Sequence, residues 1–510
     1  MKKIIIILTV IGFWSCTDLD EEVYDTIVTE NFYKTEKQVL SAAGPAYKEL
    51  RGLVQVYGAW GINQLSTDEE VLPTRGIHWF NGGEFQRFQK HTWTTEDGML
   101  NDSWKFVYNI SSNCNRLIYQ LNLVEEKSDA LISMINELKA LRAFAYFYGM
   151  DAFGNIPIVD QFDVPEGYSP STNTRKEVFD FIIKELKEAL PELSKKKDMT
   201  TYGRMNYYVV QSLLAKIYLN AEVYTGQPMW DETIEACNDV INNGGFSLAS
   251  NYFSNFAIQN QGSPENIFVI PFDDTYTTEW GYMNQFQYWT LHFTANQTFG
   301  MEAGGWNGFC AVPSFYRSYD EEDLRRNAWV VGPQFSTTGE VVYCNQELAG
   351  KPLSYSIDLT SLEASYEDEG ARLAKYDYTG AKNYTVSGDY AVIRFADVLL
   401  MKAEALMRKN GGNATAEAVA LVNSVRERSF SNPDTKLYTI ATLTMDALLA
   451  ERGWEFAGEG WRRNDQIRFN NFTTGKWTFK ENDSPDSRNL FPIPQSQINS
   501  NPNLDQNPGY

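Results

Sequence analysis

Residues 138–159 read LKALRAFAYFYGMDAFGNIPIV, and this stretch decides the fold class. With the residues just before it, the stretch places apolar side chains at alternating steps of four and three, which lays one stripe along a helix. The stripe consists of Met134, Leu138, Leu141, Ala145 and Tyr148. Small side chains such as Ala143 leave room for a second helix to approach closely. We therefore expect a helix that packs against other helices.

Further helices are expected on the C-terminal side of this stretch. Two more apolar stripes have helical spacing, namely Ile182, Leu186, Ala189 and Leu193, and Val210, Leu213, Ile217, Ala221 and Tyr224. Helices are also predicted at residues 235–241, from Tyr390 to Asn410, and at residues 416–428 and 441–457. Repeated antiparallel helix pairs of this length are typical of tetratricopeptide-like scaffolds. The predicted fold class is therefore mainly α, built on such helix pairs.

Two segments lack helical periodicity and are rich in Gly, Asn, Thr and aromatic residues: residues 66–93 and about 250–385. We expect long loops there, with short strands and short helices. Loops of this length inside a compact protein usually carry function. The aromatic residues of the longer segment include Tyr276, Trp280, Tyr282, Phe286, Tyr288, Trp289, Phe293 and Trp306.

The chain begins with the outline of an export signal. Two lysines precede an apolar run, residues 4–14, which is too short to span a bilayer. Ser15 and Cys16 follow, as in a bacterial lipoprotein signal, so residues 1–15 are predicted to be removed and Cys16 to carry acyl chains. An ordinary secretory signal with an incidental Cys is the alternative. The acidic residues 17–22 either resemble a signal for transfer to the cell surface or form a solvated tether.

Composition excludes several functions. The chain of 510 residues has 66 acidic and 44 basic residues, a net charge of −22 that repels phosphate backbones and excludes nucleic acid as a partner. Its histidines, His78, His91 and His292, are not at metal-ligand spacing. The cysteines after the signal, Cys114, Cys237, Cys310 and Cys344, form no Cys-x-x-Cys pair, which speaks against zinc. We expect mostly buried free thiols and no cofactor or metal, with a structural calcium ion left open.

Five stretches together resemble one family of proteins. They are residues 138–159, 204–221, 390–407, 451–469 and 490–510. In this order they resemble the SusD/RagB family of outer-membrane nutrient-binding lipoproteins, over nearly the whole mature chain. The resemblance implies a mainly helical scaffold with tetratricopeptide-like helix pairs, on which the irregular segments form the ligand site.

The resemblance also implies an organisation and a location. Residues 16–510 are expected to form a single domain, with a helical half at about 16–250 and a loop-rich and C-terminal half at 251–510. The protein is expected on the outer face of the outer membrane, held by its lipid anchor. There it caps a SusC/RagA-type TonB-dependent transporter and helps deliver glycans or peptides to it. It is expected to bind its ligand and not to act as an enzyme.

The first candidate site lies in residues 66–83, STDEEVLPTRGIHWFNGG. Sugars stack on aromatic rings while polar side chains hold their hydroxyl groups, so Trp79 and Phe80 near a glycine-rich turn fit a glycan site. The stretch resembles a PTRG-x-x-W-x-x-GG pattern of part of the family, in which the Trp lies at the glycan site. Asp68 is a candidate acceptor for sugar hydroxyls. The alternatives are a Trp that packs the loop onto the scaffold and an Asp that caps a turn.

The second candidate site lies at residues 304–313. Trp306 offers a ring, glycines around it allow close backbone approach to a ligand, and Cys310 resembles a cysteine that lines the pocket in some relatives. Arg372 is a candidate partner for a hydroxyl or a carboxylate, with a surface ion pair as its alternative. Tyr282 and Trp289 are further candidate rings.

Four functions remain to be weighed. Aromatic richness favours a glycan as ligand, and a peptide on the same scaffold is the alternative. A glycoside hydrolase would need two carboxylates in the aromatic cleft. Glu455 and Glu459 lie four residues apart beside arginines, which predicts structural ion pairs instead. Arg142 and Asp151 are likewise predicted to join helices. A bare scaffold for protein assembly is the fourth possibility.

Overall fold

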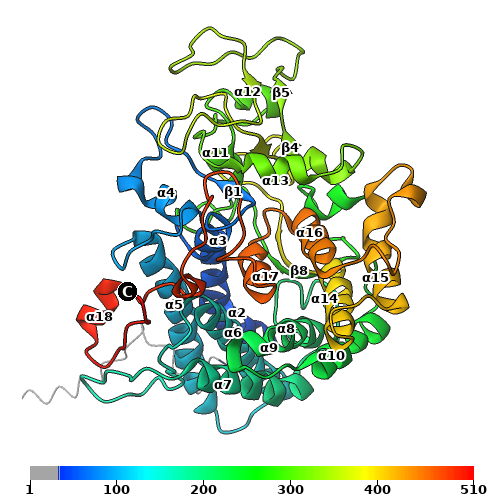
Figure 1. Cartoon of the computed structure of the whole chain (residues 1–510). Helices are drawn as coiled ribbons and strands as arrows, with labels where there is room; N and C mark the ends of the chain where they lie inside the picture. The colour runs from blue at the N-terminus through cyan, green and yellow to red at the C-terminus, as the bar shows by residue number, and fades with distance from the viewer. Residues whose placement is uncertain (1–32, 34) are drawn as a thin grey trace, which may run out of the picture.

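The computed structural model describes residue 33 and residues 35–510 (Figure 1). The predicted signal peptide, Cys16 and the acidic residues after it lie outside these residues. Helices form the lower part of the molecule in Figure 1, and loops with short elements form the upper part. We call residues 66–93 and 273–386 the crown, and the helices below it the scaffold. Within the described part of the chain, no helix combines the length and apolarity needed to cross a membrane.

The first part of the scaffold runs from α2 to α10. Its helices are α2 (Glu36–Glu49), α5 (Gly98–Asn122), α6 (Asp129–Phe153), α7 (Arg175–Ala189), α8 (Tyr207–Leu219), α9 (Ala221–Thr225) and α10 (Trp230–Asn243). Helix α5 packs against α6, α6 against α7, and α8 against α10. Every residue of α6 from Met134 onward, except Lys139, is buried, so the helix that decides the fold is enclosed on all sides.

Local sequence fixes the ends of these helices. The Ser128 side chain accepts the amide of Leu131 to begin α6, and Thr174 and Glu177 form a capping box at the start of α7. Helix α6 ends at Gly154, whose φ of 72° favours glycine.

The second part of the scaffold continues the same array. Its helices are α14 (Phe395–Lys409), α15 (Ala416–Arg426), α16 (Met445–Phe456), α17 (Arg462–Arg468) and α18 (Gln495–Ser500). Helix α10 packs against α14, and α14 against α15. The expected mainly α fold with packed helix pairs is thereby confirmed.

Buried ion pairs join helices that are distant in sequence. Arg142 of α6 binds Glu185 of α7 at 2.5 Å, and Asp151 of α6 binds Arg463 of α17 at 3.0 Å. The predicted helix-joining roles of Arg142 and Asp151 are therefore confirmed.

One predicted helix begins later than expected. Residues Tyr390–Arg394 form strand β8, which pairs antiparallel with β2 (Asn266–Ile270), and α14 starts only at Phe395. The prediction of a helix from Tyr390 was wrong because a short apolar run fits a buried strand as well as a helix. All five residues of β8 are buried, and Val392 and Ile393 are β-branched, which favours the strand.

The crown consists of loops with short elements, as predicted. Helix α3 (Ala59–Gln64) leads into the crown, whose own helices are α4 (Glu84–Gln89), α11 (Phe286–Thr290), α12 (Asn296–Phe299) and α13 (Pro313–Ser318). Its strands are β1 (Glu70–Val71), β3 (Cys310–Ala311), β4 (Trp329–Val330), β5 (Gly332–Pro333), β6 (Ser354–Tyr355) and β7 (Arg372–Leu373). Antiparallel pairs form between β1 and β3, β4 and β7, and β5 and β6. The β1–β3 pair joins the two irregular segments.

A buried charge network fixes the crown to the scaffold. We call it the Glu455 network, and its members are Glu265, Arg325, Lys375, Arg394, Arg426, Arg428, Glu451, Glu455 and Glu459. The Glu455 carboxylate lies 2.7 Å from Arg428, 2.9 Å from Arg394 and 3.2 Å from Arg325. The prediction that Glu455 and Glu459 form structural ion pairs is confirmed.

The network determines the protonation of Glu455. Burial alone would raise the pKa of this carboxyl group, but the guanidinium groups of Arg428, Arg394 and Arg325 outweigh burial and lower the pKa to about 2. Glu455 is therefore ionised in the folded protein at any ordinary pH.

Replacing Glu455 with Gln should lower the free energy of unfolding by about 3–5 kcal/mol, because it leaves buried arginines without their counter-charge. Urea unfolding at neutral pH measures the change. Because the folded-state pKa is depressed, the Glu455 contribution is present above the ordinary value of 4.5 and is lost as the pH falls toward 2. The difference between variant and wild type should shrink over that range.

The matched control is Asp180→Asn, which removes the exposed Lys176–Asp180 pair of α7. Such a pair contributes about 0.3–0.5 kcal/mol. Equal stability of Glu455→Gln and Asp180→Asn would contradict a structural role for the network.

Candidate functional site

Four aromatic rings lie in contact along one side of the crown. We call them the aromatic strip: Trp280, Trp306, Tyr288 and Tyr384. The Trp306 ring centroid lies 5.7 Å from that of Trp280 and 5.6 Å from that of Tyr288, and the Tyr288 ring lies 5.2 Å from that of Tyr384. Trp280 is 68% exposed and Tyr384 is 48% exposed, Trp306 is half-buried, and Tyr288 is buried beneath its neighbours. The strip therefore presents accessible ring surface at both ends and in the middle.

Strained backbone surrounds the strip. Trp79, Asn307, Asn383 and Tyr384 have φ values of 63°, 58°, 51° and 62°, in the left-handed region that non-glycine residues rarely adopt. Such conformations persist only where surrounding contacts hold them, and they collect at ligand sites.

The backbone around Trp306 is held against α11 and the residues that follow it. The Trp306 amide binds the Tyr288 carbonyl at 2.5 Å, and the Gly308 amide binds the Trp289 carbonyl at 2.8 Å. A Cβ atom at Gly304 would lie 1.7 Å from the Phe293 carbonyl oxygen, so only glycine fits. The glycines expected to bring the backbone close to a ligand instead bring it close to residues 289–293.

Trp79 lies next to Trp306. Its indole N–H donates to the Trp306 carbonyl at 2.6 Å, and its ring contacts Phe85 at a centroid distance of 6.0 Å. Trp79 is half-buried, whereas Phe80 is 60% exposed beside it. The structure thus brings together the two regions that the sequence singled out, with Trp79 supporting the backbone that carries Trp306.

Asp68 is engaged within the protein. Its two carboxylate oxygens each lie 2.8 Å from the Arg462 guanidinium, which forms a bidentate pair. Glu69 and Glu70, which follow, are fully buried. Burial, as the largest effect, raises the pKa of Glu69 to about 8, and the neighbouring Asp68 charge adds to it.

Cys310 and Arg372 lie beneath the surface. Both side chains are inaccessible, and the Cys310 thiol lies 3.4 Å from the Arg75 guanidinium. The Arg372 guanidinium donates to the backbone carbonyls of Thr290, Gly308, Glu367 and Glu369 at 2.9–3.3 Å. Arg372 therefore clamps loops of the crown together, and neither the surface ion pair nor a free guanidinium is found. All four cysteines of the described chain are buried free thiols, as expected.

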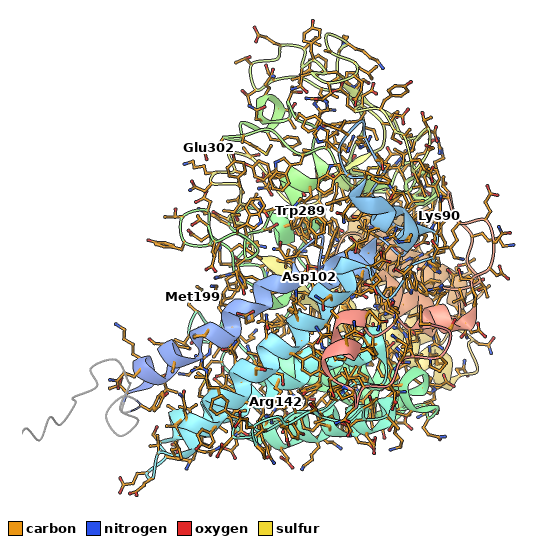
Figure 2. The ribbon with its side chains drawn as sticks, turned by 90° about the vertical axis from the view of Figure 1, so that its left-hand side faces the viewer. Lys90, Asp102, Arg142, Met199, Trp289 and Glu302 are labelled. Atoms are coloured by element: carbon orange, nitrogen blue, oxygen red, sulfur yellow. The ribbon has the colours of Figure 1, made fainter. Side chains whose placement is uncertain are left out.

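Trp289 and Tyr282 stand apart from the strip. Trp289 is buried and packs against Phe286; Figure 2 labels it within the crown, well above Arg142 of the scaffold. The Tyr282 hydroxyl donates to the Glu49 carboxylate at 3.0 Å, and the ammonium group of Lys48 lies over its ring. Tyr282 thus fastens its loop to α2.

Trp280, Tyr288 and Tyr384 are the strip residues that sequence reasoning did not select. Trp280 lies two residues from Tyr282, and Tyr288 lies next to Trp289, both of which were selected. The sequence therefore indicated the right segment but not the residues whose rings form the strip. Trp280 precedes Gly281, whose φ is 85°, and an aromatic residue inside a tight turn is a usable signal for an exposed ring. Tyr384 carries no comparable signal, because its neighbours in the strip are about 80–100 residues away.

A helical array that carries a partly exposed aromatic strip on its loops is suited to binding, and comparison with known proteins identifies the family. The model described as "SusD family" matches residues 264–510, and the model described as "Starch-binding associating with outer membrane" matches residues 48–219. Together they match most of the chain. The protein belongs to the SusD/RagB family.

Relatives and solved structures agree over nearly the whole length. The starch-binding protein SusD of Bacteroides thetaiotaomicron is 26% identical over 88% of this chain and 85% of its own. A laminarin binding SusD-like protein has a TM-score of 0.73 at 23% identity, covering 94% of this chain and all of the other. Surface glycan-binding protein A from Bacteroides thetaiotaomicron, in complex with laminarihexaose, has a TM-score of 0.72 at 18% identity, covering 92% and 99%.

Replacing Glu69 with Gln should change how stability depends on pH. The pKa of Glu69 is raised in the folded state. Its contribution to the free energy of unfolding is therefore fully present below pH 4.5, the ordinary pKa, and is lost as the pH rises toward 8. Wild type should lose at most about 1.4 kcal/mol per pH unit over this range relative to Glu69→Gln, which stays neutral. Urea unfolding at several pH values measures this. The exposed Glu166→Gln is the control, and parallel pH profiles of Glu69→Gln and wild type would overturn the prediction.

Proposed function

We propose that this protein is a cell-surface lipoprotein that binds a neutral oligo- or polysaccharide and passes it to a partner TonB-dependent transporter of the outer membrane. The aromatic strip is the observation that carries this proposal. Ring faces bind the apolar faces of sugars without requiring charge, and a row of tilted rings suits a ligand of several sugar units. The names of the relatives support the choice of glycan, because they include starch-binding and laminarin binding proteins.

Charge around the strip narrows the class of glycan. Glu279, which adjoins Trp280, is paired with Lys48 at 2.5 Å, and the Glu302 carboxylate accepts the amide of Asn383 at 2.7 Å, next to Tyr384. With a net charge of −22 for the whole chain, the protein does not attract uronate or sulfate groups. A neutral glycan is therefore the ligand that fits.

Binding without cleavage is part of the proposal. The acidic residues near the crown that could serve a hydrolase are already engaged. Asp273 accepts the amides of Thr275 and Tyr276, and Asp320 pairs with Lys436 at 2.8 Å. Asp323 pairs with Arg325 at 2.7 Å. A peptide ligand remains the alternative, since ring faces also bind apolar side chains.

Affinity electrophoresis in gels containing laminarin, starch or an anionic polysaccharide tests the ligand. We expect a neutral glycan to retard the protein without any release of reducing sugar. Trp306→Ala and Trp280→Ala should each bind at least about tenfold more weakly, because each lost ring contact removes about 1.4 kcal/mol or more of binding free energy. Trp79→Ala should weaken binding through the loss of support for Trp306. Tyr168→Ala removes an exposed ring outside the crown and is the matched control.

Each outcome is informative. Retardation by an anionic polysaccharide alone would overturn the neutral ligand, and binding that survives both strip variants would move the site away from the strip. Absence of retardation by every glycan would favour the peptide. Release of sugar would overturn binding without cleavage.

A Cys16→Ser variant tests the anchor. Acylation requires the thiol, so we expect the variant to leave the membrane fraction and to lose palmitate labelling, while its binding to the glycan in solution is unchanged. Surface exposure is measured by digestion of intact cells with a protease. Membrane retention of Cys16→Ser, or protection of the wild type from the protease, would contradict this part of the proposal.

A further inference from the structure

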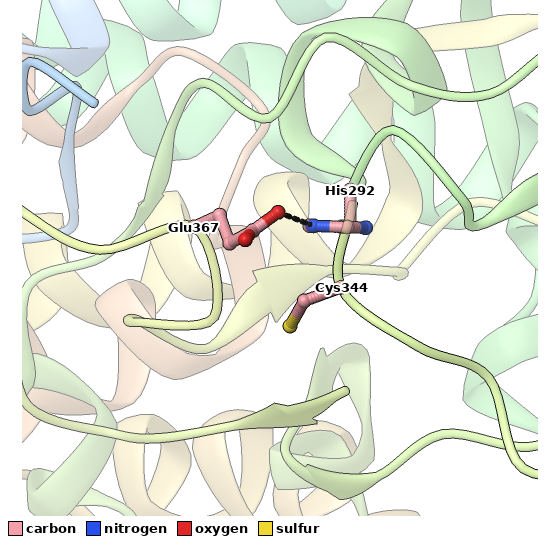
Figure 3. A group of neighbouring side chains, drawn as sticks. All are labelled: His292, Cys344 and Glu367. Carbon is pink, nitrogen blue, oxygen red and sulfur yellow. Dashed lines mark hydrogen bonds and ion pairs between the residues drawn. The ribbon is translucent and has the colours of Figure 1, made fainter. Parts of the chain in front are cut away.

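Three side chains from separate loops of the crown converge at one buried point (Figure 3). They are His292, which follows α11, Cys344, between β5 and β6, and Glu367, before β7. Their imidazole nitrogen, thiol sulfur and carboxylate oxygen all lie within 4.8 Å of one another, and all three residues are buried. We propose that these side chains bind a zinc ion.

The hydrogen bonds of His292 hold its ring in place. Nδ1 accepts the Thr294 amide at 3.1 Å and lies 2.9 Å from the Thr294 hydroxyl, which itself lies 3.1 Å from the Tyr343 carbonyl. Because Nδ1 accepts an amide, it keeps its lone pair and Nε2 carries the ring proton. Contacts of the second ring nitrogen fix the orientation of metal-bound histidines in the same way.

Nε2–H faces Glu367 and donates to its carboxylate. Nε2 lies 2.8 Å from Oε2. A zinc ion here would replace the Nε2 proton and would be bound by Nε2, Oε2 and the sulfur of Cys344. The ring proton would then lie on Nδ1, within hydrogen-bond distance of the Thr294 hydroxyl.

Glu367 is held as a ligating carboxylate is held. It accepts the backbone amides of Gln346 at 2.9 Å and Leu348 at 2.6 Å. These amides belong to the turn that follows Cys344, so the same turn positions two of the three donors. The Cys344 amide in turn binds the Lys351 carbonyl at 2.9 Å, which fixes the backbone of the cysteine.

The donor set selects the metal. Imidazole, thiolate and carboxylate are the ligands that zinc takes in proteins, with a water molecule in the fourth position where the protein supplies three. The charge of a divalent ion is balanced by one thiolate and one carboxylate, which suits a buried site. The His292 carbonyl accepts the amide of Gly305, directly before Trp306, so the ion would stabilise the loop that carries the aromatic strip.

Metal content tests the inference without any use of glycan binding. The purified protein is stripped with a chelator, equilibrated with Zn²⁺ or Co²⁺, separated from free metal, and analysed by mass spectrometry for metal per chain. We expect one retained zinc ion, and, with cobalt, a near-ultraviolet sulfur-to-metal absorption band. Cys344→Ser should abolish the band and weaken zinc binding by more than about 100-fold, and His292→Gln should weaken it similarly. Cys237→Ser, at a buried thiol of α10, is the matched control and should keep both signals.

Two results would overturn the zinc site. One is wild-type protein that retains no zinc after equilibration, which leaves a proton between His292 and Glu367. The other is a cobalt band that persists in Cys344→Ser. Should Cys344→Ser fail to fold, Thr294→Val keeps all three donors and removes only the hydroxyl beside Nδ1, the acceptor that the Nδ1 proton of a zinc-bound His292 needs. It should weaken zinc binding by about 10–100-fold, and unchanged affinity in Thr294→Val would also count against the site.

Discussion

The ionised carboxylate of Glu455, buried among three guanidinium groups, is the interaction on which the arrangement of the two parts of the molecule depends. The scaffold holds itself together by apolar helix faces, but the crown has few regular elements and no comparable face. Arg325 and Lys375 come from the crown, and apart from Asp323, which also binds Arg325, the acids that bind them come from α16 and the turn after it. A buried charge without its partner costs far more than a lost apolar contact, so each pair also specifies where the crown sits.

Buried arginine side chains also hold the loops of the crown to one another. Arg372 binds four backbone carbonyls, and Arg75 binds the carbonyl of Tyr366 at 2.5 Å together with the thiol of Cys310. Each guanidinium has several donors in a fixed plane, so one side chain can satisfy the polar groups of several loops at once. These clamps lie directly beneath Gly308 and the backbone that carries Trp306. A binding surface made of loops is thereby held in one shape before a ligand arrives, which lowers the entropic cost of binding.

The sequence predicted features that depend on neighbouring residues and missed features that depend on residues far apart in the chain. Several helices were predicted because an apolar period of 3.6 residues is visible in a short window, and α15 and α16 were placed to within a few residues, whereas α2 and α5 were not predicted. Strand β8 was missed because its partner, β2, is more than a hundred residues away. Asp68 looked free until the structure placed Arg462 against it, and Arg372 looked exposed until the loops closed over it. His292, Cys344 and Glu367 lack ligand spacing for the same reason, because the fold and not the sequence brings them together.

The direction in which a ring points, and not its burial, separates core aromatic residues from those of the strip, since Tyr288 and Trp289 are both buried. Trp289 and Tyr288 are neighbours in α11, yet Trp289 turns into the core while Tyr288 turns toward Trp306. A ring in the core is stabilised by packing in the folded protein, whereas a ring at the surface stays in contact with water until a ligand covers it. Trp280, with two thirds of its surface exposed, packs its ring on Trp306 and leaves the rest uncovered. An exposed ring on a half-buried ring suits a ligand with an apolar face, and a neutral glycan has such a face.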